Sequence, residues 1–145
     1  MNTIAITRGV LDEAQCFFED CGTQGYEGTA LIARHEDGAT RLVIPDQQAA
    51  AGSACWVEIT EQGKLELALA VTRDERYVAR IHSHPGAAFH SKTDDRNPVL
   101  THQGAISIVA PYFGLGLRRG LDACAVYILQ RNEWVELPSG LRACV

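Results

Sequence analysis

The sequence predicts an α+β fold in which a single mixed β-sheet is flanked by helices. Near the N-terminus, apolar residues recur every three to four positions, which is the period of an amphipathic helix. Farther along, short apolar runs have the length of buried strands and lie on both sides of a second candidate helix. The order helix, strands, helix, strands is typical of α+β proteins. At 145 residues, the chain is expected to form one domain over residues 1–145.

A helix, a hairpin and a third strand are expected in the first half of the chain. The apolar spacing predicts a helix over residues 8–21, and Gly22 is expected to end it. Two apolar runs joined by an Asp-Gly turn signal predict a hairpin over residues 28–44. The small and polar residues 46–53 predict a loop, and residues 55–59 predict the next strand.

A second helix is expected over residues 61–73, with Thr60 at its N-terminus. Gly63 disfavours a helix interior by about 1 kcal/mol relative to alanine, so a strand over the same residues stays open as the alternative. The predicted apolar face of the helix consists of Leu65, Ala68, Leu69 and Val71.

Four more strands are expected in the second half of the chain. Each is rich in apolar or β-branched residues and is bounded by residues that favour turns. A loop over residues 114–117 is expected between the second and the third of them, followed by the exposed side chains of Arg118 and Arg119. The four strands cover residues 77–81, 105–110, 123–129 and 133–137.

Composition and charge exclude several classes of function. A net charge of −5 argues against a nucleic-acid-binding surface, which would be basic. No apolar run approaches the roughly 18 residues that a membrane-spanning helix needs. The N-terminus lacks the charged segment and long apolar core of a signal peptide. We therefore expect a cytoplasmic protein.

The cysteines are expected to be reduced thiols. An odd number without a Cys-x-x-Cys pair is typical of a cytosolic protein and not of a disulfide framework. Their apolar neighbours predict small, buried hydrophobic side chains. The five are Cys16, Cys21, Cys55, Cys124 and Cys144.

The candidate chemistry lies in residues 80–95. His82 and His84 are two positions apart at the end of an apolar run, so in a strand their imidazoles project from the same face. A Pro-Gly dipeptide then ends the strand. Ser91 begins a Ser-Lys-Thr-Asp helix cap, which places Asp94 one turn inside. Two imidazoles, one carboxylate and an open fourth position form the arrangement of a catalytic zinc site.

A His-x-His pair alone is weak support for a metal site, because most such histidines are structural or lie on the surface. The Pro-Gly and Ser-x-x-Asp elements that follow within a few residues favour a metal site over chance. The remaining histidines, His35, His90 and His102, are expected not to be ligands, although His90 lies inside the loop and could contact a substrate.

These residues resemble the motif of the JAMM metalloproteases, also called JAB or MPN, which joins an upstream Glu to His-x-His-Pro, a spacer and Ser-x-x-Asp. The resemblance covers nearly the whole chain and implies the JAB/MPN fold, with a layering like that of cytidine deaminases. The spacer from Pro85 to His90 is one residue shorter than usual, so Asp95 is an alternative ligand, but only Asp94 keeps the Ser-to-Asp spacing. The motif positions here are Glu27, His82, His84, Ser91 and Asp94.

The resemblance implies a zinc-dependent peptidase or isopeptidase with one Zn²⁺ per chain, held by His82, His84 and Asp94. Glu27 would carry a proton from water to the leaving amine, and Ser91 would donate a hydrogen bond to the oxyanion. The implied partner is a ubiquitin-like protein, cleaved after its C-terminal tail during deconjugation or precursor processing. Some conjugation systems of this kind belong to antiphage defence operons.

Two alternatives stay open at this point. The same chemistry could process a sulfur-carrier protein or a small-molecule conjugate. MPN-type domains also serve as metal-free scaffolds, but these typically lack one or more ligands, whereas all five motif positions are filled here. A deaminase-type zinc site is disfavoured because no His-x-Glu with a later Pro-Cys-x-x-Cys occurs, and no His-Glu-x-x-His helix is present.

Overall fold

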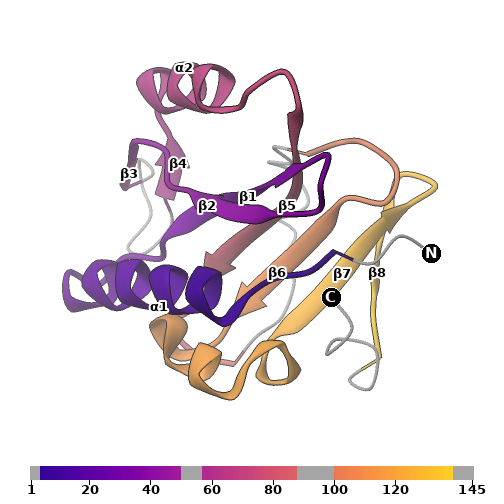
Figure 1. Ribbon diagram of the computed structural model, residues 1–145. Coiled ribbons are helices and arrows are strands. Elements are labelled where there is room, and N and C mark those ends of the chain that lie inside the picture. Colours follow the sequence, from indigo (N-terminus) through magenta and orange to yellow (C-terminus); the bar gives the residue numbers. More distant parts are fainter. Residues whose placement is uncertain (1–3, 50–56, 88–99, 139–145) are drawn as a thin grey trace.

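The computed structural model describes residues 4–49, 57–87 and 100–138 (Figure 1). It confirms the α+β fold, with a six-stranded mixed sheet in the order β2-β1-β5-β6-β7-β8. Only β5 and β6 are parallel, and every other neighbouring pair in this sheet is antiparallel. The strands are β1 (Thr29–His35), β2 (Thr40–Val43), β5 (Glu75–Ser83), β6 (Ile106–Ala110), β7 (Ala125–Gln130) and β8 (Glu133–Glu136). The predicted hairpin and the four predicted later strands are all among them.

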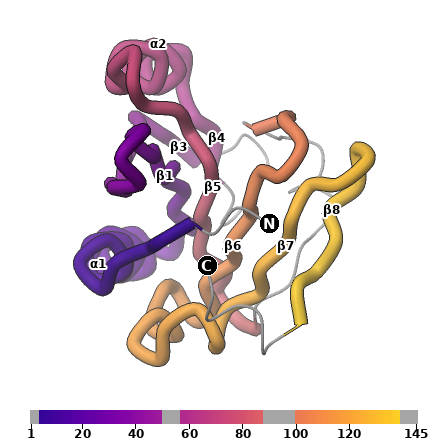
Figure 2. The backbone as a smooth tube through the Cα atoms, turned by 45° about the vertical axis from the view of Figure 1, so that its right-hand side comes forward, coloured from indigo at the N-terminus to yellow at the C-terminus, as the bar shows by residue number. Residues whose placement is uncertain are grey.

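The first helix, α1 (Arg8–Thr23), packs on one face of this sheet (Figure 2). It begins after Thr7, whose side-chain oxygen accepts a hydrogen bond of 3.3 Å from the Val10 N–H. The prediction that Gly22 ends the helix is wrong, because the helix continues through it. Gly22 is required for a different reason: a Cβ there would lie 2.7 Å from the Cβ of Phe113. Close packing, and not helix termination, explains this glycine.

A separate two-stranded hairpin, β3 (Gln47–Ala49) and β4 (Val57–Ile59), leads into α2 (Glu61–Ala70). The prediction of a loop over residues 46–53 is therefore wrong near its start, because Gln47–Ala49 form the strand β3. The side chains of β3 are half-buried or exposed, so its sequence carries no alternating apolar signal. Its pairing with β4, which lies within the strand predicted over residues 55–59, is what makes it a strand.

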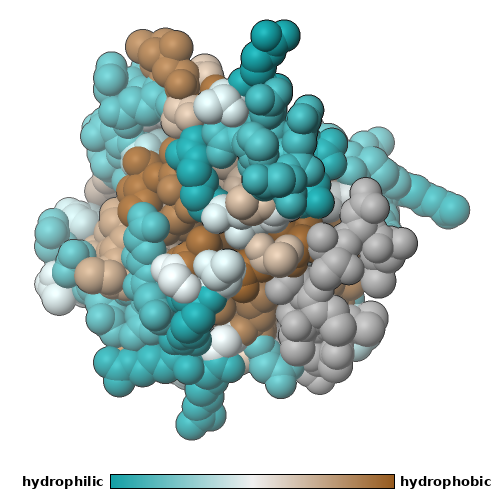
Figure 3. Space-filling model, in the orientation of Figure 1, coloured by the Kyte–Doolittle hydropathy of each residue, from teal (hydrophilic) through white to brown (hydrophobic). Residues whose placement is uncertain are grey.

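The prediction of a helix after Thr60 is confirmed, but the predicted apolar face is wrong. Leu65 and Leu69 are 53% and 74% exposed, and apolar atoms appear on the outer side of α2 in Figure 3. The residues that α2 buries are Gly63 and Leu67. A Cβ at Gly63 would collide with a backbone carbonyl before β3, so the glycine lets the helix approach that segment closely.

Two 3₁₀ helices, η1 (Tyr112–Arg119) and η2 (Leu121–Ala123), occupy the region where a loop was predicted. The two arginines that end η1 are exposed, as predicted. η1 lies beside α1, and the Arg8 Nη1 atom donates a hydrogen bond of 2.8 Å to the Leu117 carbonyl. Leu117 is fully buried, which gives this segment an apolar anchor that a solvent-exposed loop would lack.

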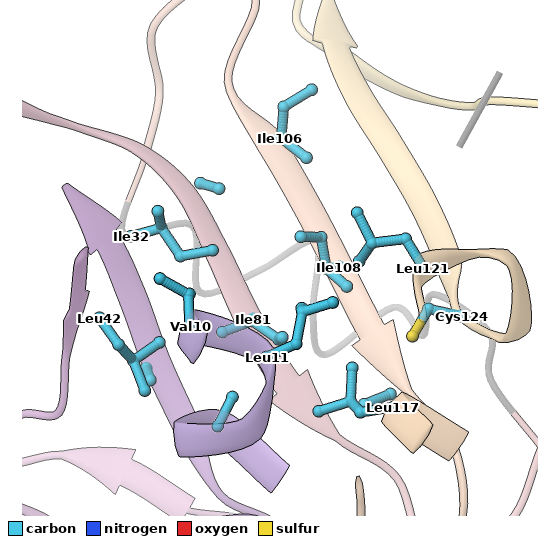
Figure 4. Close-up of a cluster of buried hydrophobic side chains, with 14 of the residues drawn as sticks. Val10, Leu11, Ile32, Leu42, Ile81, Ile106, Ile108, Leu117, Leu121 and Cys124 are labelled. Carbon is cyan, nitrogen blue, oxygen red and sulfur yellow. The ribbon is translucent and has the colours of Figure 1, made fainter. Parts of the chain in front are cut away.

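Two hydrophobic clusters cover the two faces of the sheet. The larger lies between the sheet, α1 and the 3₁₀ helices, where Ile32, Ile81 and Ile108 from three adjacent strands point towards Val10 and Leu11 (Figure 4). The smaller lies on the opposite face and includes Leu67 of α2. No helix within the described ranges is both long enough and apolar enough to cross a bilayer.

The thiols differ in their burial. Cys124 is buried, as predicted, but Cys21 is only half-buried and Cys16 is exposed, so the prediction is wrong for Cys16. All three are free thiols. Burial raises the pKa of the Cys21 thiol, with a smaller effect of the same sign from the Asp20 carboxylate. Cys55 and Cys144 lie outside the described residues.

An ion pair joins β2 and β5, the strands on either side of β1. Arg41 of β2 donates hydrogen bonds of 2.7 and 2.9 Å to the two carboxylate oxygens of Glu75 at the start of β5. It also donates to the Ala70 carbonyl at 2.6 Å. The guanidinium of Arg41, and then the Thr72 backbone N–H, lower the pKa of Glu75 from 4.5 to about 2. A lowered carboxylate pKa means that the folded state favours the ionised form.

Glu75→Gln should therefore destabilise the fold in a pH-dependent way. The contribution of the ionised carboxylate is fully present above pH 4.5 and is lost as the pH falls towards 2, because the folded-state pKa is about 2. In thermal unfolding followed by circular dichroism, the Tm gap between wild type and Glu75→Gln should be largest near pH 6 and should close at low pH. Glu61→Gln, which removes an exposed pair with Lys64, is the control and should change Tm little at any pH. A gap that stays constant with pH would contradict this assignment.

Candidate metal centre

Both histidines of the predicted motif lie at the C-terminal end of β5. His82 is inside the strand, where its Cα is opposite Thr29 of β1 and Val109 of β6. His84 follows directly after the end of the strand. They are only 9% and 5% exposed. β5 has a hydrogen-bonded strand on each side, so this buried pair of imidazoles lies in the middle of the sheet.

The spacing of the two imidazoles fits one shared metal ion. Their ring centres are 5.1 Å apart. A nitrogen–zinc bond of about 2.0–2.1 Å, added to roughly 1.2 Å from nitrogen to ring centre, puts each centre about 3.2 Å from the ion. A tetrahedral angle at the ion would then separate the centres by about 5.2 Å. The rings are also inclined by 57°, so they do not stack on each other.

The backbone around His84 is fixed by the segment that follows β6. The His84 N–H donates to the Ala110 carbonyl at 2.8 Å, and the His84 carbonyl accepts from the Phe113 N–H at 2.7 Å. Two residues farther on, the Gly86 carbonyl accepts from the Tyr112 N–H at 2.9 Å. Two backbone hydrogen bonds thus hold His84 itself, and a third holds the chain two residues beyond it.

This segment adopts an uncommon backbone conformation. Tyr112, Phe113 and Gly114 have φ angles of 55°, 51° and 89°, so three successive residues are left-handed. Each non-glycine residue in that region costs on the order of 1–3 kcal/mol. The loop prediction missed this feature, and the Pro-x-x-Gly pattern of residues 111–114 is the only sequence signal of a tight turn there.

Glu27 lies two residues before β1, at the end of that strand that pairs with His82 of β5. The Ser83 N–H donates to the Gly28 carbonyl at 3.0 Å, and the Gly28 N–H donates to the Ser83 hydroxyl at 2.9 Å. Gly28 and Ser83 are therefore opposite each other, one step beyond the pair Thr29 and His82. If the same register continued by one more residue, Glu27 would be opposite His84, and side chains directly opposite in antiparallel strands lie on the same face. Glu27 is half-buried.

The β3–β4 hairpin is attached to the same end of β1 through one side chain. The Gln47 amide accepts a hydrogen bond of 2.9 Å from the Thr29 N–H and donates one of 2.8 Å to the Thr29 carbonyl. A second donation, of 2.9 Å to the Pro45 carbonyl, orients the amide. The Gln47 side chain thus makes the hydrogen bonds that a neighbouring strand would make to Thr29, the residue opposite His82. The hairpin is fixed beside the candidate site.

A buried arginine lies on the same face of β5 as the histidines, and sequence reasoning missed it. Arg80 is 5% exposed and donates a hydrogen bond of 2.9 Å from Nε to the Ser107 hydroxyl of β6. Its guanidinium carbon lies 4.5 Å from the ring centre of Trp134, within the range of a cation–π interaction. No short motif in the sequence marks these contacts, because the three residues come from three different strands.

The remaining motif residues, Ser91 and Asp94, lie outside the described residues. So do the alternative ligand Asp95 and the loop histidine His90. Within residues 4–49, 57–87 and 100–138, no group of three or more His, Cys, Asp or Glu side chains is arranged to hold a metal ion. A metal site built on the two imidazoles would therefore need a further ligand from outside these ranges.

The other described histidines lie far along the sheet from this pair. His35 is opposite Glu75, at the start of β5, and it contacts the Asp37 carboxylate at 3.2 Å. His102 precedes β6, which runs parallel to β5, so it lies at the same distant end. Burial, and then the charge of Arg76, lower the pKa of His102.

One comparison with known proteins bears on this site. The chain is 32% identical over 148 aligned positions to a protein of Sinorhizobium fredii named probable metalloprotease y4jG. The alignment covers 97% of this chain and 91% of the relative. No family model matches the chain.

The paired imidazoles lead to a prediction about metal content. The wild-type protein should contain one zinc ion per chain, removable by a strong chelator, and His82→Ala should reduce this to less than about 0.2 equivalents. His35→Ala is the matched control and should keep its metal. Elemental analysis after gel filtration measures both. Asp94→Ala and Asp95→Ala distinguish the two candidate third ligands, since only the true ligand should empty the site. A zinc-free wild type with full activity would contradict the metal site.

Proposed function

The chain belongs to the family of the probable metalloprotease y4jG, and from this premise we propose that it is a zinc-dependent peptidase of the JAMM type. The observation that carries the proposal is the pair of buried imidazoles with ring centres 5.1 Å apart, beside a carboxylate on the neighbouring chain segment. The proposed ligands are His82, His84 and Asp94, with a fourth position left for water. This donor set is that of a catalytic site and not of a closed structural one.

A zinc ion bound there would polarise the scissile carbonyl and lower the pKa of a coordinated water towards 7. We assign the proton transfer to Glu27, because the β1–β5 register, continued by one residue beyond Gly28 and Ser83, would bring its carboxylate to the same face as the imidazoles. Glu27 accepts the proton of the attacking water and returns it to the leaving amine. The proposed role of the Ser91 hydroxyl is to donate a hydrogen bond to the developing oxyanion.

The proposed substrate is the C-terminal tail of a ubiquitin-like protein, cleaved from an amine or from a precursor extension. An extended tail can bind by adding a strand to an exposed sheet edge. Within the described residues, β3 and β4 pair only with each other, so each has an outer edge. The Gln47 amide fixes this hairpin beside Thr29, the residue opposite His82. A tail paired with the hairpin would therefore pass close to the imidazoles.

Glu27→Ala tests the assigned proton transfer. The variant should keep its fold and its zinc, and its rate should fall by roughly 10²–10⁴-fold, the usual contribution of general acid–base catalysis. Glu36→Ala is the matched control, because Glu36 is an exposed carboxylate at the far end of β1. Cleavage of a fluorogenic tail peptide and zinc content measure the two properties separately. A Glu27→Ala protein that cleaves at the wild-type rate would overturn the assignment, and one that loses zinc would make Glu27 a ligand instead.

The burial of the imidazoles predicts a preference for small residues at the cleavage site. His82 and His84 are 9% and 5% exposed, so a substrate carbonyl reaches them only through a narrow approach. Tails that end in Gly-Gly should be cleaved at least about tenfold faster than otherwise identical tails that end in Leu-Leu. The measurement is kcat/KM for matched ubiquitin-like fusions. Equal rates for the two junctions would count against this substrate class.

A further inference from the structure

We infer that Gly22 of α1 and the left-handed segment Tyr112–Gly114 together position His84, so that α1 controls the geometry of the metal site without contributing a ligand. This inference rests on the proposed role of His84 as a metal ligand. Its basis is a chain of contacts from the helix to the histidine backbone, none of which the JAMM motif includes.

The two histidines are held in different ways. His82 is a strand residue, and its backbone position is set by β1 and β6 on either side. His84 lies after the end of β5, where its N–H makes the last bond to the sheet, donating to the carbonyl of Ala110 at the end of β6 at 2.8 Å. Its carbonyl accepts instead from the Phe113 N–H of the segment after β6, at 2.7 Å. The direction of the His84 side chain therefore depends on where the segment after β6 lies.

That segment makes its two bonds to the chain around His84, from the N–H groups of Tyr112 and Phe113, in a left-handed conformation. Successive residues in this region point their N–H groups to the same side of the chain. Here the Tyr112 N–H donates to the Gly86 carbonyl and the Phe113 N–H donates to the His84 carbonyl. The conformation is disfavoured for tyrosine and phenylalanine, so the surrounding structure must maintain it.

α1 supplies that support by close packing at two glycines. A Cβ at Gly22 would lie 2.7 Å from the Phe113 Cβ, and a Cβ at Gly114 would lie 2.6 Å from the Phe18 Cβ. Phe18 is fully buried and Phe113 is half-buried, so neither ring can move freely into solvent. The helix thus holds Phe113 at the position from which its N–H reaches His84. A larger residue at position 22 would push Phe113 away and move the carbonyl of His84 with it.

Two alanine variants in the same helix test the inference. Gly22→Ala should weaken metal binding by roughly 10–100-fold, as loss of an orienting partner usually does, although alanine for glycine in a helix normally stabilises it. Gly9→Ala is the matched control, since a Cβ there meets nothing closer than 3.8 Å, and it should bind metal within about twofold of wild type. The measurement is titration of the metal-free full chain with Co²⁺. The visible absorption of the bound ion also reports coordination geometry and should change only in Gly22→Ala.

A second pair of variants tests the positioning role if Gly22→Ala does not fold. Tyr112 is 55% exposed, so its side chain contributes little packing, and its φ of 55° suits glycine but not valine. Tyr112→Gly should bind Co²⁺ at least as tightly as wild type, whereas Tyr112→Val should bind it at least about tenfold more weakly. The Tm of each metal-free variant controls for loss of fold.

The possible results separate the inference from the proposed function. If the wild type binds no metal, the proposed metalloprotease site is wrong, and this inference is wrong with it. If the wild type binds metal but Gly22→Ala matches Gly9→Ala, or Tyr112→Gly matches Tyr112→Val, the site stands and the positioning role is overturned.

Discussion

The structure depends on the burial of β5, which has a strand hydrogen-bonded to each of its edges. Its residues from Val78 to Ser83 are all buried, and three of those residues are polar. A buried polar group must be compensated, because desolvation without a partner costs about 1–3 kcal/mol or more. Arg80 is compensated by Ser107 and Trp134. The same requirement at His82 makes a metal ion an energetically sensible neighbour, so stability and the proposed chemistry place demands on one strand.

Features set by local periodicity could be predicted from the sequence, whereas features set by distant contacts could not. The first helix, the β1–β2 hairpin and the later strands follow from apolar spacing. The exposed Leu65 and Leu69 show the limit of this reasoning, since Gly63 and its close approach to a backbone carbonyl decide which side of α2 is buried. The continuation of α1 through Gly22 has the same kind of cause, a contact with a residue about ninety positions away.

The same distinction between local patterns and distant contacts applies to the candidate site. His82 and His84 could be paired from sequence because residues two apart in a strand share a face. The place of Glu27 could not, because nothing local states that β1 pairs with β5 in the register that brings Thr29 opposite His82. The family motif implies that Glu27 and the histidines are neighbours, which stays a prediction, and the Gly28–Ser83 hydrogen bonds carry the observed pairing to within one residue of both. Arg80 and Tyr112 had no signal, since their contacts come from other strands and from backbone geometry.

The Gln47 amide has a consequence for how such a protein can diversify. One side chain occupies both hydrogen-bonding groups of Thr29, so the sheet ends there without needing a matching strand. Among the described residues, the hairpin is thereby joined to the main sheet by the chain that follows β2 and by this amide, and not through a shared ladder of backbone bonds. Its length and sequence can then vary over generations while the imidazoles keep their places. Under the proposed function, substrate binding by the hairpin and chemistry at the imidazoles would then rest on separate parts of the chain, and the first could change without rebuilding the core.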